Sequence, residues 1–178
     1  MSAPTLLTER LELKGPHPSD FPDFAAMWAN PDVVKFIGGE ARNHQDSWLT
    51  LIRNAGMWVM LGYGPWTVRE RDTGDYVGDA GFADYQRGMD PDISGTPEAG
   101  WAFAKHHWGK GYATEALIAT HAWLDETLPG RSTCIIEPDH TVSIRVAQKL
   151  GYRDFASSDY KGTPMLIFER HSPGTGKG

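Results

Sequence analysis

Residues 98 to 116 read EAGWAFAKHHWGKGYATEA, and this stretch decides the fold. Its first part, Glu98 to Ala104, predicts a strand, and a glycine-containing turn then opens a helix that runs to about Glu126. Because Gly109 and Gly111 carry no Cβ, the backbone N–H groups around them can approach one anion together. The first turn of the helix adds unpaired N–H donors and the positive end of its dipole. The stretch therefore predicts a cradle for a pyrophosphate.

The segment before this stretch predicts a strand, two helices and two further strands. Residues 6–14 alternate as an opening strand, and residues 21–28 have the spacing of a short amphipathic helix. A second helix begins near Asn43, and the expected core-facing residues are Trp48, Leu51, Ile52 and Ala55. Residues 66–70 and 76–83 then form a hairpin around a polar turn.

The segment after the helix predicts one more strand, one helix and a closing hairpin. Thr133 to Glu137 is a short apolar strand, and Thr141 to Leu150 is a helix that Gly151 ends. Residues 152–158 and 164–170 have the pattern of the hairpin. This order implies an α/β or α+β domain with a mixed sheet. We expect one domain over residues 1–171 and a flexible glycine- and proline-rich tail over residues 172–178.

Composition excludes several classes of protein. With 178 residues and a net charge of −6, the chain lacks the basic surface of a general nucleic-acid binder. Its single cysteine, Cys134, permits no internal disulfide and is expected to be a buried strand residue. A charged N-terminal segment and the shortness of the longest apolar run, Met57 to Leu61, predict neither a signal peptide nor a membrane span. We therefore expect a cytoplasmic protein.

Other nucleotide and metal motifs do not fit. The chain has no P-loop, because Gly174-Thr-Gly-Lys177 lacks the first glycine at the required spacing and the final Ser or Thr. It also has no Gly-x-Gly-x-x-Gly followed by an acidic residue, which disfavours a dinucleotide site. The adjacent His106 and His107 do not predict a metal site, since neighbouring residues rarely face one ion.

Residues 108–116, WGKGYATEA, resemble the acetyl-CoA pyrophosphate loop of the GNAT superfamily of N-acetyltransferases. The resemblance is to the branch of the ribosomal-protein N-terminal alanine and serine acetyltransferases. Three further stretches agree with it in order and spacing: residues 8–13 (TERLEL), 76–82 (YVGDAGF) and 136–152 (IEPDHTVSIRVAQKLGY). The resemblance covers about residues 5 to 170.

The resemblance implies a GNAT fold and a defined cofactor position. It implies a mixed, mostly antiparallel sheet of about six or seven strands with about four flanking helices. The strand from Glu98 carries a bulge and splays from the strand at Thr133, and the pantetheine arm of acetyl-CoA lies in the gap. No metal is required, and a homodimer is possible in this family. The implied cofactor-binding residues are Trp101, Ala102, Phe103, His106, His107, Trp108, Gly109, Lys110, Gly111, Tyr112, Ala113, Thr114, His140 and Ser143.

The implied reaction is direct acetyl transfer in a ternary complex, with Glu98 and Ser143 as the catalytic candidates. An alkylammonium group has a pKa of about 10 and must lose a proton before attack, and a carboxylate can accept that proton. Glu98 is the candidate base, with Asp84 and Glu137 as lesser candidates, and Ser143 is placed to donate to the leaving thiolate.

Three positions depart from the family pattern. His106 stands where Gln or Arg opens the loop, His140 stands where the last helix usually begins with Asn, and Ala147 stands where many members carry a catalytic Tyr. The missing Asn and Tyr keep open a catalytically silent acyl-CoA-binding module. A Ser–His hydrolase built from Ser143 and His140 is disfavoured, because no Gly-x-Ser-x-Gly elbow is present.

The resemblance implies an amine acceptor, whose identity the sequence leaves open between a protein N-terminus and a small molecule. The loop from Gln86 to Pro97 carries Asp90 and Asp92 and leads to Glu98. This acidic stretch favours a cationic acceptor.

Overall fold

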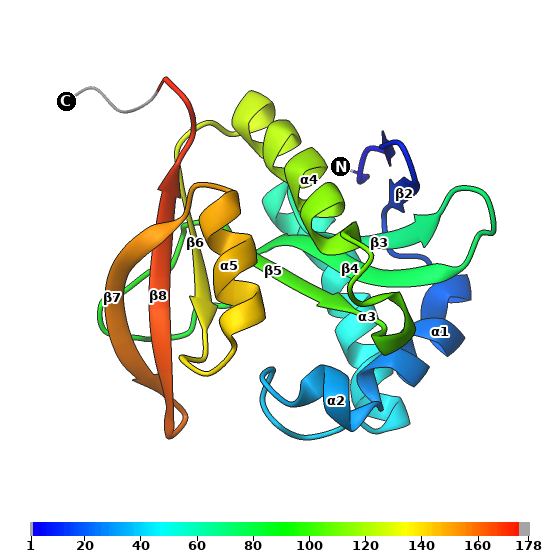
Figure 1. Cartoon of the computed structure of the whole chain (residues 1–178), viewed down its shortest axis with the longest axis horizontal. Helices are drawn as coiled ribbons and strands as arrows, with labels where there is room; N and C mark the ends of the chain where they lie inside the picture. The colour runs from blue at the N-terminus through cyan, green and yellow to red at the C-terminus, as the bar shows by residue number, and fades with distance from the viewer. Residues whose placement is uncertain (1, 175–178) are drawn as a thin grey trace.

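The computed structural model describes residues 2–174, in which eight strands form one mixed sheet (Figure 1). Its spatial order is β1-β2-β3-β4-β5-β6-β8-β7, and every neighbouring pair is antiparallel except β5 with β6. The sheet is thus mixed and mostly antiparallel, as expected, with one strand more than the expected range. The strands are β1 (Leu6–Leu7), β2 (Leu11–Lys14), β3 (Pro65–Glu70), β4 (Tyr76–Ala83), β5 (Glu98–Phe103), β6 (Arg131–Ile136), β7 (Arg153–Tyr160) and β8 (Thr163–His171).

Helices cover both faces of the sheet. Alternate residues of a strand point to opposite faces, so Val77 and Phe103 pack with α4 while Tyr76 and Ala102 pack with α1. In Figure 1, α4 crosses in front of β4 and β5, and α3 passes behind them. The helices are α1 (Phe21–Trp28), α2 (Pro31–Val34), α3 (His44–Leu61), α4 (Tyr112–Thr127) and α5 (Thr141–Lys149), with short 3₁₀ turns η1 (Pro18–Asp20) and η2 (Lys105–His107).

Two local expectations were wrong. The opening strand over residues 6–14 is interrupted, because the side chain of Thr8 accepts the N–H of Leu11 at 2.9 Å and turns the chain between β1 and β2. On α3, Leu51 is buried, but Trp48 and Ile52 are 36% and 49% exposed. The buried face of α3 instead follows Ser47, Leu51, Asn54 and Trp58, a stripe that includes two polar residues. Two polar members hide this stripe from a search for apolar periodicity.

The sheet splits between β5 and β6. These parallel strands pair only at Glu98 and Thr133, and beyond that pair they diverge (Figure 1). This confirms the expected splay. The expected bulge in β5 was wrong, because the pairing of β4 with β5 runs from Gly78–Phe103 to Ala83–Glu98 without a register shift. The single parallel pair is what opens the gap.

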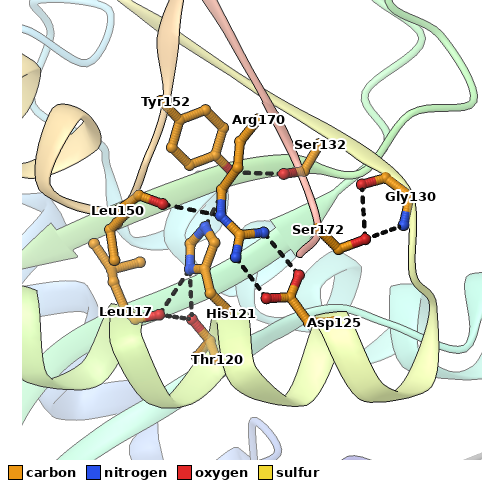
Figure 2. A network of polar contacts seen from close by, with 10 residues as sticks. All are labelled: Leu117, Thr120, His121, Asp125, Gly130, Ser132, Leu150, Tyr152, Arg170 and Ser172. Atoms are coloured by element: carbon orange, nitrogen blue, oxygen red, sulfur yellow. Dashed lines mark hydrogen bonds and ion pairs between the residues drawn. The ribbon is translucent and has the colours of Figure 1, made fainter. Parts of the chain in front are cut away.

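A buried polar network holds the far side of the gap together (Figure 2). The Tyr152 hydroxyl lies 3.0 Å from both Ser132 Oγ on β6 and His121 Nε2 on α4. His121 Nδ1 lies 2.7 Å from the carbonyl of Leu117, so Nδ1 carries the proton and Nε2 accepts from Tyr152. Arg170 on β8 adds a two-bond ion pair with Asp125 on α4, at 2.7 and 2.5 Å. The network therefore ties α4 to β6 and β8.

The C-terminal segment is attached to this network. Ser172, which the sequence assigned to a tail, is buried, and its side chain and backbone bond to Gly130 (Figure 2). Residues 175–178 of that expected tail lie outside the described residues.

Stability should depend on pH through His121. Burial lowers the pKa of His121 to about 4. Below about pH 6.5 the unfolded chain binds a proton at this residue while the folded chain does not, so stability is lost as the pH falls through this window. In urea unfolding, His121→Asn should be less stable than wild type at pH 7, and the difference should shrink by about 2 kcal/mol at pH 5. A difference that is the same at both pH values would contradict a buried neutral imidazole.

Candidate active site

The turn before α4 forms an open cradle of backbone donors. Gly109 and Gly111 have φ values of 76° and 81°, a left-handed conformation that favours glycine. No atom lies within 4 Å of the Cβ position at Gly109, and only Arg10 Nη2, at 3.5 Å, lies near that of Gly111. Within residues 2–174, the N–H groups of residues 109–114 have no hydrogen-bond acceptor. Consecutive free donors at a helix N-terminus, with open space beside them, fit a pyrophosphate.

The cradle is anchored by a residue pair that the sequence analysis missed. Glu115, in the first turn of α4, accepts from Thr8 Oγ1 at 2.6 Å and from the N–H of Arg10 at 2.9 Å. Arg10 also pairs with Glu115 Oε2 at 2.6 Å and donates to the carbonyl of Lys110 at 2.9 Å. The guanidinium therefore neutralises an acidic side chain that would repel a phosphate and fixes the turn. The only sequence signal was a Thr and an Arg in the opening motif.

Two expected cofactor contacts face into the protein. Tyr112 donates its hydroxyl proton to Glu70 on β3, which holds the pKa of Glu70 below its usual value. His107 is buried, and its Nδ1 lies 3.4 Å from Lys110 Nζ and 3.6 Å from Glu70 Oε1. Burial lowers the pKa of His107, which favours the neutral ring. These side chains support the turn from beneath, whereas His106 is exposed.

The edge of β5 that faces the gap offers backbone groups to a ligand. The carbonyl of Pro97 accepts from Thr133 on β6 at 3.0 Å, so alternate residues from there, including Trp101, direct their backbone groups toward the gap. The Phe103 carbonyl already accepts the indole N–H of Trp108 at 2.7 Å. Ala102 and Phe103 are themselves buried, which leaves the backbone of Trp101 as the exposed edge.

Ser143 and His140 lie together at the start of α5. Ser143 Oγ is 3.1 Å from His140 Nε2, and the imidazole stacks on Phe36 at 4.5 Å between ring centroids and 17° between planes. Burial lowers the pKa of His140. Ala147, at the place of the family's tyrosine, is fully buried in the core.

One cavity of about 540 Å³ joins these elements. It is lined by Trp101 of β5, by Ser143 of α5 and its N-cap His140, and by Asp79 of β4. Asp79 is buried, and Trp28 Nε1 donates to its Oδ2 at 3.1 Å. Loss of hydration outweighs that hydrogen bond and raises the pKa of Asp79 to about 7. The cavity thus holds a carboxyl group that titrates near neutrality, which the sequence analysis did not select.

The three carboxylates expected from the sequence have different surroundings. Glu98 is 6% exposed and forms two hydrogen bonds with Arg87, at 2.7 and 2.8 Å. Asp84 accepts from the Gln86 side chain at 2.6 Å and from the backbone N–H of Gly95 at 3.1 Å. Glu137 lines the cavity and is partly exposed. Glu98 also lines the cavity, but as half of an ion pair.

Comparison with known proteins identifies the family. A profile of the acetyltransferase (GNAT) domain matches residues 10–153. The chain belongs to the GNAT acetyltransferase family. It is 30% identical to the uncharacterised protein YkkB of Bacillus subtilis over 178 residues, 97% of this chain and 99% of YkkB. It is an acetyltransferase that uses acetyl-CoA.

Solved structures of the GNAT family share the fold. A GNAT-family acetyltransferase of Bordetella pertussis superposes with a TM-score of 0.84 at 30% identity, covering 94% of this chain and 99% of the other. A ribosomal L7/L12 alpha-N-protein acetyltransferase solved with coenzyme A has a TM-score of 0.75 at 14% identity, covering 93% and 96%. At that identity the likeness concerns the fold. Among residues 2–174 no helix has the length and apolarity to cross a membrane, and no cluster of three or more His, Cys, Asp and Glu side chains could hold a metal ion.

The cradle predicts a binding defect at Gly111. A Cβ at this left-handed residue strains the turn and re-aims its N–H groups, so Gly111→Ala should raise the Kd for acetyl-CoA roughly 10- to 100-fold in calorimetric titration. Gly74→Ala is the matched control, because Gly74 has a φ of 78° with open space around it but lies in the β3–β4 turn. Equal Kd values for the two variants would contradict the cradle.

Proposed function

We propose that the enzyme transfers the acetyl group of acetyl-CoA to a primary amine by direct attack in a ternary complex. The observation that carries this proposal is the shared cavity, in which Asp79 and Ser143 both meet the gap-facing edge of β5. A proton acceptor and a proton donor therefore lie on the same space as the expected thioester. Holding both reactants there supplies much of the rate enhancement.

The proposed cofactor position follows from the cradle and the gap. The pyrophosphate takes the N–H groups of residues 109–114, and the pantetheine arm pairs with the backbone of Trp101 between β5 and β6. The bound thioester supplies an activated acetyl group. Of the expected contacts, Gly109 to Thr114 and Trp101 are backbone contacts, which explains why His106 can replace the usual residue.

Asp79 is the proposed base. An amine acceptor enters as an ammonium ion with a pKa of about 10 and must lose a proton before attack. A carboxyl group whose pKa is about 7 accepts that proton, directly or through water, and is half ionised at neutral pH. Glu98 is less suited to this task, because both of its carboxylate oxygens already accept hydrogen bonds from Arg87. We assign Glu98 to holding Arg87.

Replacing the base should affect turnover and leave the cofactor bound. Asp79→Asn should lower kcat/KM roughly 100- to 10,000-fold while the Kd for acetyl-CoA changes less than about threefold. The wild-type rate should rise with pH through about 7, and the variant should lose that step. Thiol release in the presence of an amine panel, followed from pH 5.5 to 9, measures both quantities. Glu98→Gln is the comparison variant and should keep the step.

Ser143 is the proposed donor to the leaving thiolate, with His140 Nε2 hydrogen-bonded behind it. This contact is also that of a hydrolase pair, but within the described residues the His140 side chain hydrogen-bonds only to Ser143, and no carboxylate orients its ring. The arrangement therefore favours proton donation over nucleophilic attack.

Ser143→Ala should lower kcat roughly 10- to 100-fold without raising the Kd for acetyl-CoA. Wild type should also resist a fluorophosphonate that labels activated serines. Labelling that disappears in Ser143→Ala would favour the hydrolase. Tight acetyl-CoA binding without turnover on any amine would favour the silent module.

A further inference from the structure

The cavity contains two arginines that the proposed chemistry does not use. Arg42, before α3, and Arg53, within α3, both line it, and neither forms an ion pair within residues 2–174. Arg87 also lines the cavity, but Glu98 neutralises it. In a chain with a net charge of −6, two arginines without ion pairs on one cavity wall favour an anionic ligand.

Arg42 is held in place. Its guanidinium lies 3.7 Å above the Trp28 ring, and Nη1 lies 3.2 Å from Thr50 Oγ1. Burial lowers the pKa of Arg42, so the site bears a desolvation cost for this charge. Arg53 lies 5.3 Å from the Tyr85 ring centre, also on the cavity wall. A guanidinium fixed by aromatic stacking retains donors for a planar or tetrahedral anion.

Asp79 does not neutralise this pair. Its nearest bond is to Trp28, no hydrogen bond joins it to Arg42 or Arg53, and at neutral pH it is protonated about half the time. The acidic loop does not do so either, because Asp90 and Asp92 do not line the cavity. The wall also carries Glu137 and Lys161, so its positive side chains still outnumber its acidic ones. The expectation of a cationic acceptor, drawn from that loop, does not match this charge.

A third group in the cavity lacks a partner. Asn54, one residue after Arg53, is 4% exposed and lines the cavity, and its Oδ1 has no hydrogen-bond partner. A buried amide oxygen without a donor is costly, and an ammonium or amine N–H would satisfy it. The same wall thus offers a free acceptor beside two guanidinium groups that form no ion pair.

We propose that the acceptor is an amine that also carries an anionic group, a carboxylate or a phosphate, with the anion bound by Arg42 and Arg53 and the amine directed toward Asn54 and Asp79. This inference rests on the proposed function, since it names the acceptor of that same cavity. The two anions share the chemistry that the guanidinium groups recognise.

Matched acceptors separate the anion from the amine. Tyrosine is compared with tyramine, and O-phosphoethanolamine with ethanolamine, in acetyl transfer by the full-length enzyme. Binding of each compound to the enzyme saturated with coenzyme A is measured by calorimetry. Wild type should prefer at least one anionic member roughly 10- to 100-fold in kcat/KM and in Kd, and the pair that shows it identifies the anion.

Arg53→Gln is the main variant, because Arg53 is exposed and its replacement leaves the core intact. It should remove most of the preference in Kd, while the Kd of the member without the anionic group changes less than about threefold. Arg42→Gln should act in the same direction. Arg153→Gln, an exposed arginine on β7 that does not line the cavity, is the matched control and should leave the preference unchanged.

The outcomes separate this inference from the proposed function. Acetylation of both members of each pair at equal rates would overturn the anionic acceptor and leave the acetyltransferase standing. Preferential binding of the members that carry the anion, without acetylation of any member, would overturn acetyl transfer in this cavity and leave the anion site standing. No preference in either readout, or a preference that survives both arginine substitutions, would overturn the inference.

Discussion

The structure depends on the parting of β5 from β6. One parallel pair, Glu98 with Thr133, keeps the sheet continuous, and the absence of further pairing opens a gap with free backbone groups on its edge. An open sheet loses ladder hydrogen bonds, so β6 needs support from elsewhere. It comes from six antiparallel pairs with β8 and from the buried bonds of Tyr152 and His121. The gap is stable because both halves of the sheet pack on α4 in one continuous core.

The position of Glu98, where β5 and β6 separate, also determines its ion pair. Because it sits where the strands part and is buried, its charge needs a partner, and Arg87 supplies one with two hydrogen bonds. The loop before β5 is thereby attached to the mouth of the gap. In this ion pair the charges of Glu98 and Arg87 neutralise each other. The other charged groups near Asp79 in the cavity are then Arg42 and Arg53.

Local patterns allowed the order of strands and helices and the glycine turn before α4 to be predicted, and the resemblance of four motifs indicated the GNAT fold. Gly109 and Gly111 are two residues apart, and their conformational freedom and the helix that follows can be read from the segment itself. The anchor of Arg10 on Glu115 joins residues 105 apart, and no local pattern reports it. Asp79 was quoted within a motif and not chosen, because its unusual pKa comes from burial beneath α1 and α3. Arg53 was missed because the expected buried face of α3 was wrong. Arg42 was missed because its position on the cavity wall depends on tertiary packing that no local pattern reports.

The charges of the cavity link recognition to proton transfer. Loss of hydration raises the pKa of Asp79, and the charges of Arg42 and Arg53 offset part of that rise. An anionic group held by the two arginines would offset their charge at Asp79 and exclude water from it, and each effect raises the pKa of the carboxyl group. Asp79 would then be a stronger base when an anionic acceptor is bound than when the cavity is open. An acceptor without the anion leaves the arginines uncompensated and Asp79 more acidic, so it is penalised in proton transfer as well as in binding.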